Sequence, residues 1–170
     1  EVDVQAFRGA AGSGDLQKVA ELLDANPELL NERGGTGMRT ALHDATSGGH
    51  EAVVKFLLER GADPNIRCEG DSAMPLHFAA EKQHLPIIRL LIEHGADPVG
   101  EGDYHELEVI GWATSWEYVN ARQEVVDYLT AHGARNNIFS AVAMGEVQDI
   151  RKLVAESRAK QPGGGASPER

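Results

Sequence analysis

The chain has 170 residues, a single cysteine and a formal net charge of −11 at pH 7. This charge argues against a nucleic-acid-binding protein, which needs basic residues to neutralise phosphates, and against adsorption to an anionic membrane. One cysteine excludes both an internal disulfide and a zinc site made of several cysteines.

Only 5% of the residues are aromatic, whereas 19 are glycine. That balance favours many thin, similar layers over one large core, so it directs attention to internal repeats. The chain lacks an apolar run of the roughly 18 residues that a membrane helix needs and the basic-then-apolar order of a secretion signal. We therefore expect a cytoplasmic location. Residue 1 is Glu rather than Met, so the sequence is expected to be trimmed or part of a longer chain.

Five units share one pattern of small and aliphatic residues. The first, about residues 4–33, and the last, about residues 137–157, keep part of the pattern and are predicted to cap the two ends. Three full units are predicted between them, at about 34–67, 68–101 and 102–136. Residues 158–170 are rich in Gly and Pro, which predicts a flexible tail or linker.

The second and third units carry the repeat most clearly, because nine residues recur at a constant offset of 34. They are Leu42, His43, Ala45, His50, Leu57, Gly61, Ala62, Asp63 and Pro64. Helical spacing predicts a short helix that starts after Thr40, as its N-cap, and a second helix that ends at Gly61. Two helices this short cannot bury their apolar faces alone, so the units are predicted to stack into an all-α solenoid.

The fourth unit is irregular because it carries an insertion within about residues 115–121. Both tryptophans and two tyrosines gather nearby, at Tyr104, Trp112, Trp116 and Tyr118. Two interpretations stay open. These side chains fill a gap that the insertion creates, or they form a binding hot spot, in which Trp and Tyr are common.

The segments TALHDAT, GGHEAVVKFLLERGAD, MPLHFAA and IIRLLIEHGAD resemble the ankyrin repeat, and the resemblance covers roughly residues 4–157. It implies an L-shaped stack of helix pairs with loops or hairpins projecting to one side, and a protein-binding module without catalysis. It also implies that His43 and His77 tie adjacent units together. Gly111 stands where the family has that histidine. The family's glycine before each first helix is replaced by Met38, Ser72 and Glu106.

Carried over by position, the resemblance implies surface contacts to a partner from the second, third and fourth units. These candidates are Thr36, Arg39, Asp44, Ser47, Gly48, Asp71, Ala73, Phe78, Glu81, Lys82, Tyr104, His105, Leu107, Trp112, Ser115 and Trp116. Residues 151–170 hold five basic and two acidic residues, so the preceding part carries a net charge of −14. We therefore expect a protein partner with a basic surface, no nucleic acid or membrane partner, and a monomeric chain.

Chemistry-bearing patterns are weak elsewhere in the sequence. The histidines show no metal-ligand spacing, and Cys68 lies in a loop without a motif that would activate its thiol. The glycines of residues 34–37 are typical of a turn, and anion binding before the next helix is the other interpretation. We expect no catalytic residue, cofactor or metal. The alternative function is a small-ligand-binding or regulatory domain of a larger enzyme, with a pocket at the fourth unit.

Overall fold

The computed structural model describes residues 2–114, 123–143, 145 and 147–160. The helices are α1 (Val2–Ser13), α2 (Leu16–Ala25), the 3-10 helix η1 (Pro27–Asn31), α3 (Ala41–Ser47), α4 (Glu51–Glu59), α5 (Pro75–Glu81), α6 (Leu85–Glu93), α7 (Glu108–Thr114), α8 (Gln123–Ala131), α9 (Ile138–Ala143) and α10 (Val147–Lys160). Among these residues, an isolated antiparallel β-bridge joins Gly34 and Arg39. The predicted all-α fold is confirmed.

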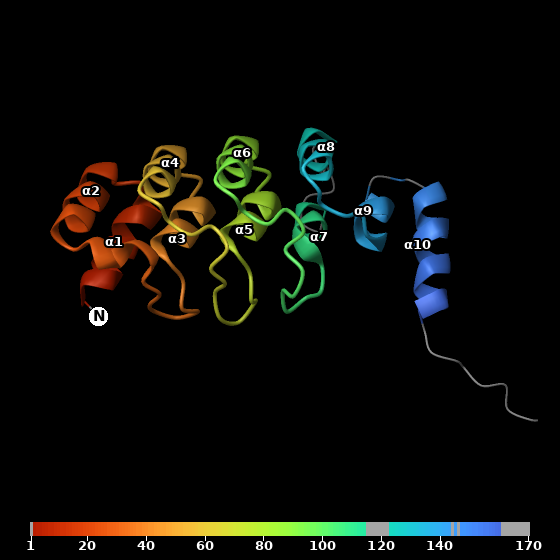
Figure 1. Ribbon diagram of the computed structural model, residues 1–170, viewed down its shortest axis with the longest axis horizontal. Helices are drawn as coiled ribbons and strands as arrows, with labels where there is room; N and C mark the ends of the chain where they lie inside the picture. Colours follow the sequence, from red (N-terminus) through yellow and green to blue (C-terminus); the bar gives the residue numbers. More distant parts are fainter. Residues whose placement is uncertain (1, 115–122, 144, 146, 161–170) are drawn as a thin grey trace, which may run out of the picture.

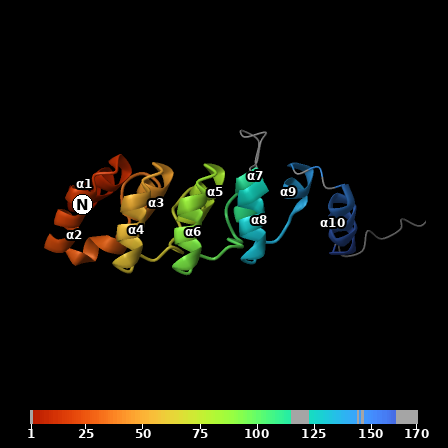
Figure 2. The same cartoon turned by 90° about the horizontal axis from the view of Figure 1, so that it is seen from above.

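The helices form two parallel rows. The inner helices α1, α3, α5, α7 and α9 pack side by side in chain order, and the outer helices α2, α4 and α6 lie in a second row above them (Figure 1). Seen from above, the rows run along the whole length of the molecule (Figure 2). The loops before α3, α5 and α7 all project to the same side (Figure 1), so one face carries inner helices and loop tips together.

Small residues let the inner helices approach closely. Ala11, Ala45, Ala79 and Ala113 recur every 34 residues, and each is at most 2% exposed. Leucines fill the seams between the outer helices in the same way. They are Leu23, Leu57 and Leu91, followed by Leu129 after the insertion, and all are buried. The core is therefore a series of repeated layers, as the few aromatic residues predict.

The predicted helix ends are present. The Thr40 side chain accepts a hydrogen bond from the backbone N–H of His43, and the His43 ring accepts one from the backbone N–H of Thr40, which makes a reciprocal cap for α3. After α4, Gly61 has a φ of 90°, a left-handed conformation that glycine adopts without strain. The chain can therefore leave the outer helix sharply and start the next loop.

Two buried histidines join adjacent units, as the family resemblance implies, because each hydrogen-bonds from its inner helix to the loop that follows. The His43 Nδ1 accepts from Thr40, so Nε2 carries the proton and donates to the Ala73 carbonyl at 3.2 Å. His77 does the same 34 residues later, and its Nε2 donates to the Gly100 carbonyl at 3.1 Å. Burial lowers the pKa of both imidazoles to about 4, so both are neutral near pH 7.

In the fourth unit, where Gly111 replaces the histidine, a hydrogen bond from Asn137 joins the fourth and fifth units instead. Its side-chain amide donates to the Leu107 carbonyl at 2.7 Å, and its side-chain oxygen accepts from the backbone N–H of Ser140 at 3.0 Å. A Cβ on Gly111 would lie 2.8 Å from the Leu107 Cβ. The loop has closed over the position that a histidine would occupy, and the next unit supplies the hydrogen bond.

The last helix extends further than the sequence pattern indicates. Helix α10 continues to Lys160, three residues into the segment that the composition places in the tail. Its aliphatic residues Ile150, Leu153 and Val154 are half-buried, whereas the next polar residues along it are exposed. The final unit therefore closes the stack with one apolar and one polar face.

Candidate functional site

The loop tips keep their backbone geometry without the family's glycine. Met38, Ser72 and Glu106 have φ angles of 44°, 52° and 54°, the left-handed region that glycine normally occupies. Each tip is joined to the next by one backbone hydrogen bond of 2.7 Å, from Glu69 to the Gly37 carbonyl and from Tyr104 to the Asp71 carbonyl. The tips therefore form a continuous edge.

An aromatic row runs behind this edge, defined by Phe78, Trp112, His105 and Tyr104. Neighbouring rings in the row pack edge to face. Their centres are 5.6 Å apart for Phe78 and Trp112, 5.8 Å for Trp112 and His105, and 5.8 Å for His105 and Tyr104. The guanidinium of Arg39 lies over Phe78, 4.5 Å from the ring centre. Phe78 and Trp112 are 6% and 8% exposed, whereas Tyr104 is 77% exposed. The row thus leads from a buried end to an open end.

Asp103 holds the open end in place. Its carboxylate is 2% exposed, and it accepts hydrogen bonds from the Trp112 indole at 3.2 Å and from the backbone N–H of Glu108 at 2.8 Å. The N–H groups of His105 and Leu107 also point to it. Burial raises the pKa of Asp103, but these hydrogen bonds outweigh burial and keep the pKa below its ordinary value. Asp103 therefore replaces the missing threonine cap before α7.

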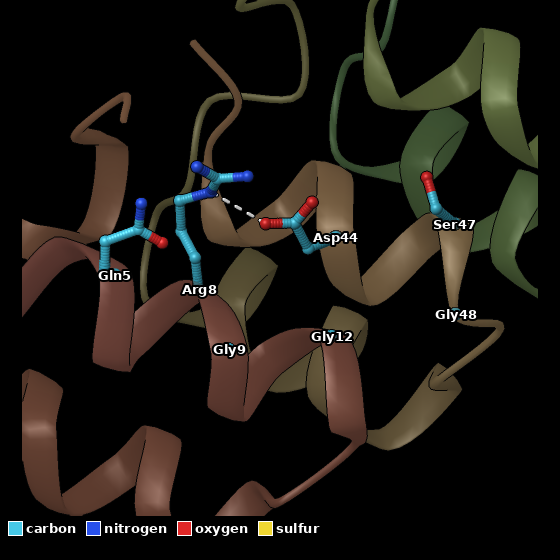
Figure 3. A pocket seen from close by; sticks show the side chains of 7 residues that line it. All are labelled: Gln5, Arg8, Gly9, Gly12, Asp44, Ser47 and Gly48. Atoms are coloured by element: carbon cyan, nitrogen blue, oxygen red, sulfur yellow. Dashed lines mark hydrogen bonds and ion pairs between the residues drawn. The ribbon is translucent and has the colours of Figure 1, made fainter. Parts of the chain in front are cut away.

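Two hollows open beside the row. The polar hollow, about 500 Å³, lies between the tips and is lined by Arg8, Thr36, Gly37, Arg39, Asp44, Glu69, Gly70 and Asp71. The helix groove, about 400 Å³, lies between α1 and α3 and is lined by Gln5, Arg8, Gly9, Gly12, Asp44, Ser47 and Gly48 (Figure 3). Arg8 and Asp44 line both. Their 2.7 Å ion pair separates the two hollows and spans α1 and α3 (Figure 3).

The structure brings several of the predicted contact residues together and separates others. Around the polar hollow and the aromatic row lie Thr36, Arg39, Asp44, Asp71, Phe78, Tyr104, His105 and Trp112. Ser47 and Gly48 line the helix groove instead, and the Ser47 hydroxyl has no hydrogen-bond partner among the residues that the structure describes. Glu81 and Lys82 contact each other at 3.8 Å where α5 ends. Ser115 and Trp116, with Tyr118, lie outside the described residues.

Three residues expected at the surface are buried. Ala73 is fully buried, because its carbonyl receives the His43 hydrogen bond. Phe78 and Trp112 pack edge to face between adjacent units, and His77 covers the Trp112 ring at 5.4 Å. For Trp112 the gap-filling interpretation therefore fits better than direct exposure. Leu107 is half-buried.

Arg8 and Asp103 were not among the residues predicted from the sequence, and Glu69 was interpreted, with Asp71, as a solvated carboxylate of a loop. Arg8 belongs to the first unit, whose pattern is too degenerate to align its surface positions. Glu69 lies in a loop whose residues vary between units. Asp103 carried a usable signal, because the helix after it lacks the threonine that caps α3 and so needs another acceptor.

The described residues hold no group of three or more His, Cys, Asp or Glu side chains arranged to bind a metal ion. Over the same part of the chain, each helix is too short or too polar to cross a bilayer. The polar hollow and the aromatic row together hold aromatic, cationic and acidic side chains.

Stacked helix pairs with one face of inner helices and loop tips define a repeat solenoid. A family model described as ankyrin repeats, in three copies, matches residues 7–101, more than half of the chain. The chain belongs to the ankyrin repeat family, whose arrays are protein-interaction modules.

Individual relatives match only part of the array. The NAD-capped RNA hydrolase NUDT12 of Homo sapiens is 43% identical over 63 residues, which are 37% of this chain and 13% of that protein. The probable E3 ubiquitin-protein ligase XBOS32 of Oryza sativa subsp. japonica is 41% identical over 58 residues, 34% of this chain and 12% of the relative. The E3 ubiquitin-protein ligase XBAT33 of Arabidopsis thaliana is 43% identical over 58 residues, 34% of this chain and 11% of that protein. The likeness is therefore confined to small parts of much longer proteins.

Proposed function

We propose that this chain binds another protein through its loop tips and inner-helix face and catalyses no reaction itself. The observation that carries the proposal is Tyr104, which is 77% exposed although its surroundings hold it in place. Its backbone N–H is bound to the Asp71 carbonyl at 2.7 Å, and its ring rests edge-on against His105. An exposed aromatic side chain on a fixed backbone loses little entropy on binding, which makes it a good anchor.

The partner has a basic surface in this proposal. The part of the chain before residue 151 carries a net charge of −14, and the acids Glu69 and Glu106 are exposed in the loops before α5 and α7. A partner surface of opposite charge would speed association, and added salt would weaken this attraction. We expect a monomeric chain in the cytoplasm. The buried single thiol of Cys68 fits a reducing compartment.

A second candidate function follows from the relatives. Their printed names are those of a hydrolase and of ubiquitin ligases, and the matched stretches are 11–13% of their lengths. The alternative is that this array belongs to a larger enzyme and recruits or regulates its target. The same face would bind in both cases, so the tests of the face apply equally.

The unit boundaries at about 34, 68, 102 and 137 are likewise proposed.

Capture of partners by the intact chain tests the proposal. Proteins retained by the chain are identified by mass spectrometry, and the capture is repeated with Tyr104→Ala. As a matched control, Lys55→Ala alters an exposed residue of the outer helix α4, whose side chain is 60% exposed. We expect Tyr104→Ala to lower the affinity for the partner about 30-fold, as the loss of a hot spot does, and Lys55→Ala to leave it unchanged. A partner that binds both variants as it binds the original chain would contradict the proposal.

A further inference from the structure

We propose that the polar hollow binds an extended partner segment that presents a carboxylate to Arg39 and a neighbouring basic side chain to Glu69. This inference rests on the proposed function, since it specifies which chemistry the inner-helix face recognises.

Arg39 is the free cation of the hollow. Its guanidinium is stacked over the Phe78 ring at 4.5 Å, and it makes no ion pair or side-chain hydrogen bond with any residue that the structure describes. The Phe78 ring lies against the guanidinium, and no described residue accepts a hydrogen bond from its N–H groups. A carboxylate binds the edge of a guanidinium with two parallel hydrogen bonds, a geometry that lysine cannot offer. The stack also holds the group in place before a ligand arrives.

Two of the three carboxylates that line the hollow have partners other than Arg39. Asp44 is paired with Arg8 at 2.7 Å, and the Asp71 carboxylate lies 3.4 Å from the His105 ring. Glu69 is exposed and has no ion pair among the described residues. Arg39 and Glu69 therefore line the same hollow without an ion pair among the described residues, and the Asp71 carboxylate has the His105 ring as its partner. A segment with both charges satisfies both groups, whereas a purely acidic or purely basic segment satisfies one and is repelled by the other.

The helix groove gives such a segment room to continue. It shares Arg8 and Asp44 with the polar hollow, and Gly9 and Gly12 add no side chain to its α1 wall beside those of Gln5 and Arg8 (Figure 3). A Cβ built on Gly9 has no atom within 4 Å, so the groove is open at that residue. From Gln5 to Gly12 the helix rises about 10 Å, the length of about three extended residues. The occupant is therefore a short stretch of extended chain.

A library of random linear peptides, displayed on phage and selected on the intact chain, supplies the probe. Enriched peptides are synthesised, and their affinities are measured by calorimetry for the original chain, Arg39→Gln, Arg39→Lys and Glu69→Gln. Gly9→Gln fills the groove wall without removing a charge or a contact. Lys55→Gln is the control on the outer face, and thermal unfolding of every variant checks the fold.

We expect the enriched peptides to share an Asp or Glu next to a Lys or Arg. Arg39→Gln and conversion of the peptide's acid to its amide should each weaken binding about ten-fold or more. Combining the two should cost no more than either alone, because they remove the same contact. Arg39→Lys should restore part of the affinity, Gly9→Gln should reduce it, and Lys55→Gln should not change it.

Three results would overturn the inference. The first is a set of peptides without a shared carboxylate, and the second is independent, additive losses from Arg39→Gln and the peptide amide. The third is binding that falls with Tyr104→Ala but not with Arg39→Gln, which would leave the proposed function intact. If neither of those two variants affected any selected peptide, the proposed function would fall together with the inference.

Discussion

Glu106→Gly is expected to stabilise the protein, although it deletes a side chain. Glu106 has a φ of 54°, it is exposed, and its side chain makes no hydrogen bond or ion pair with the described residues. The left-handed conformation costs a residue with a Cβ about 1–2 kcal/mol. Glycine removes that cost but gives back about 0.4–1 kcal/mol through the greater freedom of the unfolded chain. The net gain therefore lies between about 0 and 1.6 kcal/mol, with a midpoint of about 0.8 kcal/mol, or about 2–3 °C in Tm.

Urea unfolding followed by circular dichroism measures this gain. Glu106→Ala is the control, because it removes the same charge and keeps a Cβ in the left-handed conformation. Thr36→Gly is a second control, since Thr36 is an exposed loop residue outside the left-handed region and should lose stability. If Glu106→Gly were no more stable than Glu106→Ala, the backbone assignment at the loop tips would be wrong.

Three further perturbations test the rest of the fold. Leu57→Ala should cost about 2–5 kcal/mol of unfolding free energy, and a loss well under about 1 kcal/mol would contradict the stacked layers. The pKa of His43 and His77 is lowered from 6.5 to about 4, so the unfolded chain takes up protons first as the pH falls. Their contribution is complete above pH 6.5 and is lost towards pH 4, with a slope of up to about 1.4 kcal/mol per pH unit for each histidine. Equal stability at pH 7 and pH 5 in urea titrations would refute their neutral, buried state. Asp103→Asn places a donor against backbone N–H groups and should cost about 1–3 kcal/mol while changing the Trp112 fluorescence, and an unaltered spectrum and stability would refute its capping role.

The periodic part of the fold could be predicted because it depends on spacing. An alanine recurs every 34 residues on α1, α3, α5 and α7, and a leucine does so on α2, α4 and α6, so one offset places four inner and three outer helices. The backbone conformation of the loop tips could not be predicted in the same way, because three other residues replace the expected glycines. Met38, Ser72 and Glu106 nevertheless adopt the left-handed conformation, since the flanking helices and the hydrogen bonds between tips fix the backbone on both sides.

The site was predicted less completely than the fold. Position within the repeat indicated Arg39, Asp71 and Tyr104, and the sequence favoured Tyr104 over a partly buried Trp112 as a contact, but it placed the buried Phe78 at the surface. The Phe78 and Trp112 rings are buried because each packs against the neighbouring unit, a contact that depends on the distance between layers. The hollow depends on which charges pair across units, and a linear pattern does not specify such pairs.

The most direct test of the proposed binding face is site-specific photo-cross-linking. A benzoylphenylalanine is placed at Tyr104 on the loop tips or at Lys55 on the outer helix, and each intact chain is irradiated with its captured partner. We expect a cross-linked partner from position 104 and none from position 55. Cross-linking from position 55 alone would show that the partner binds the outer row of helices and would contradict binding through the loop tips.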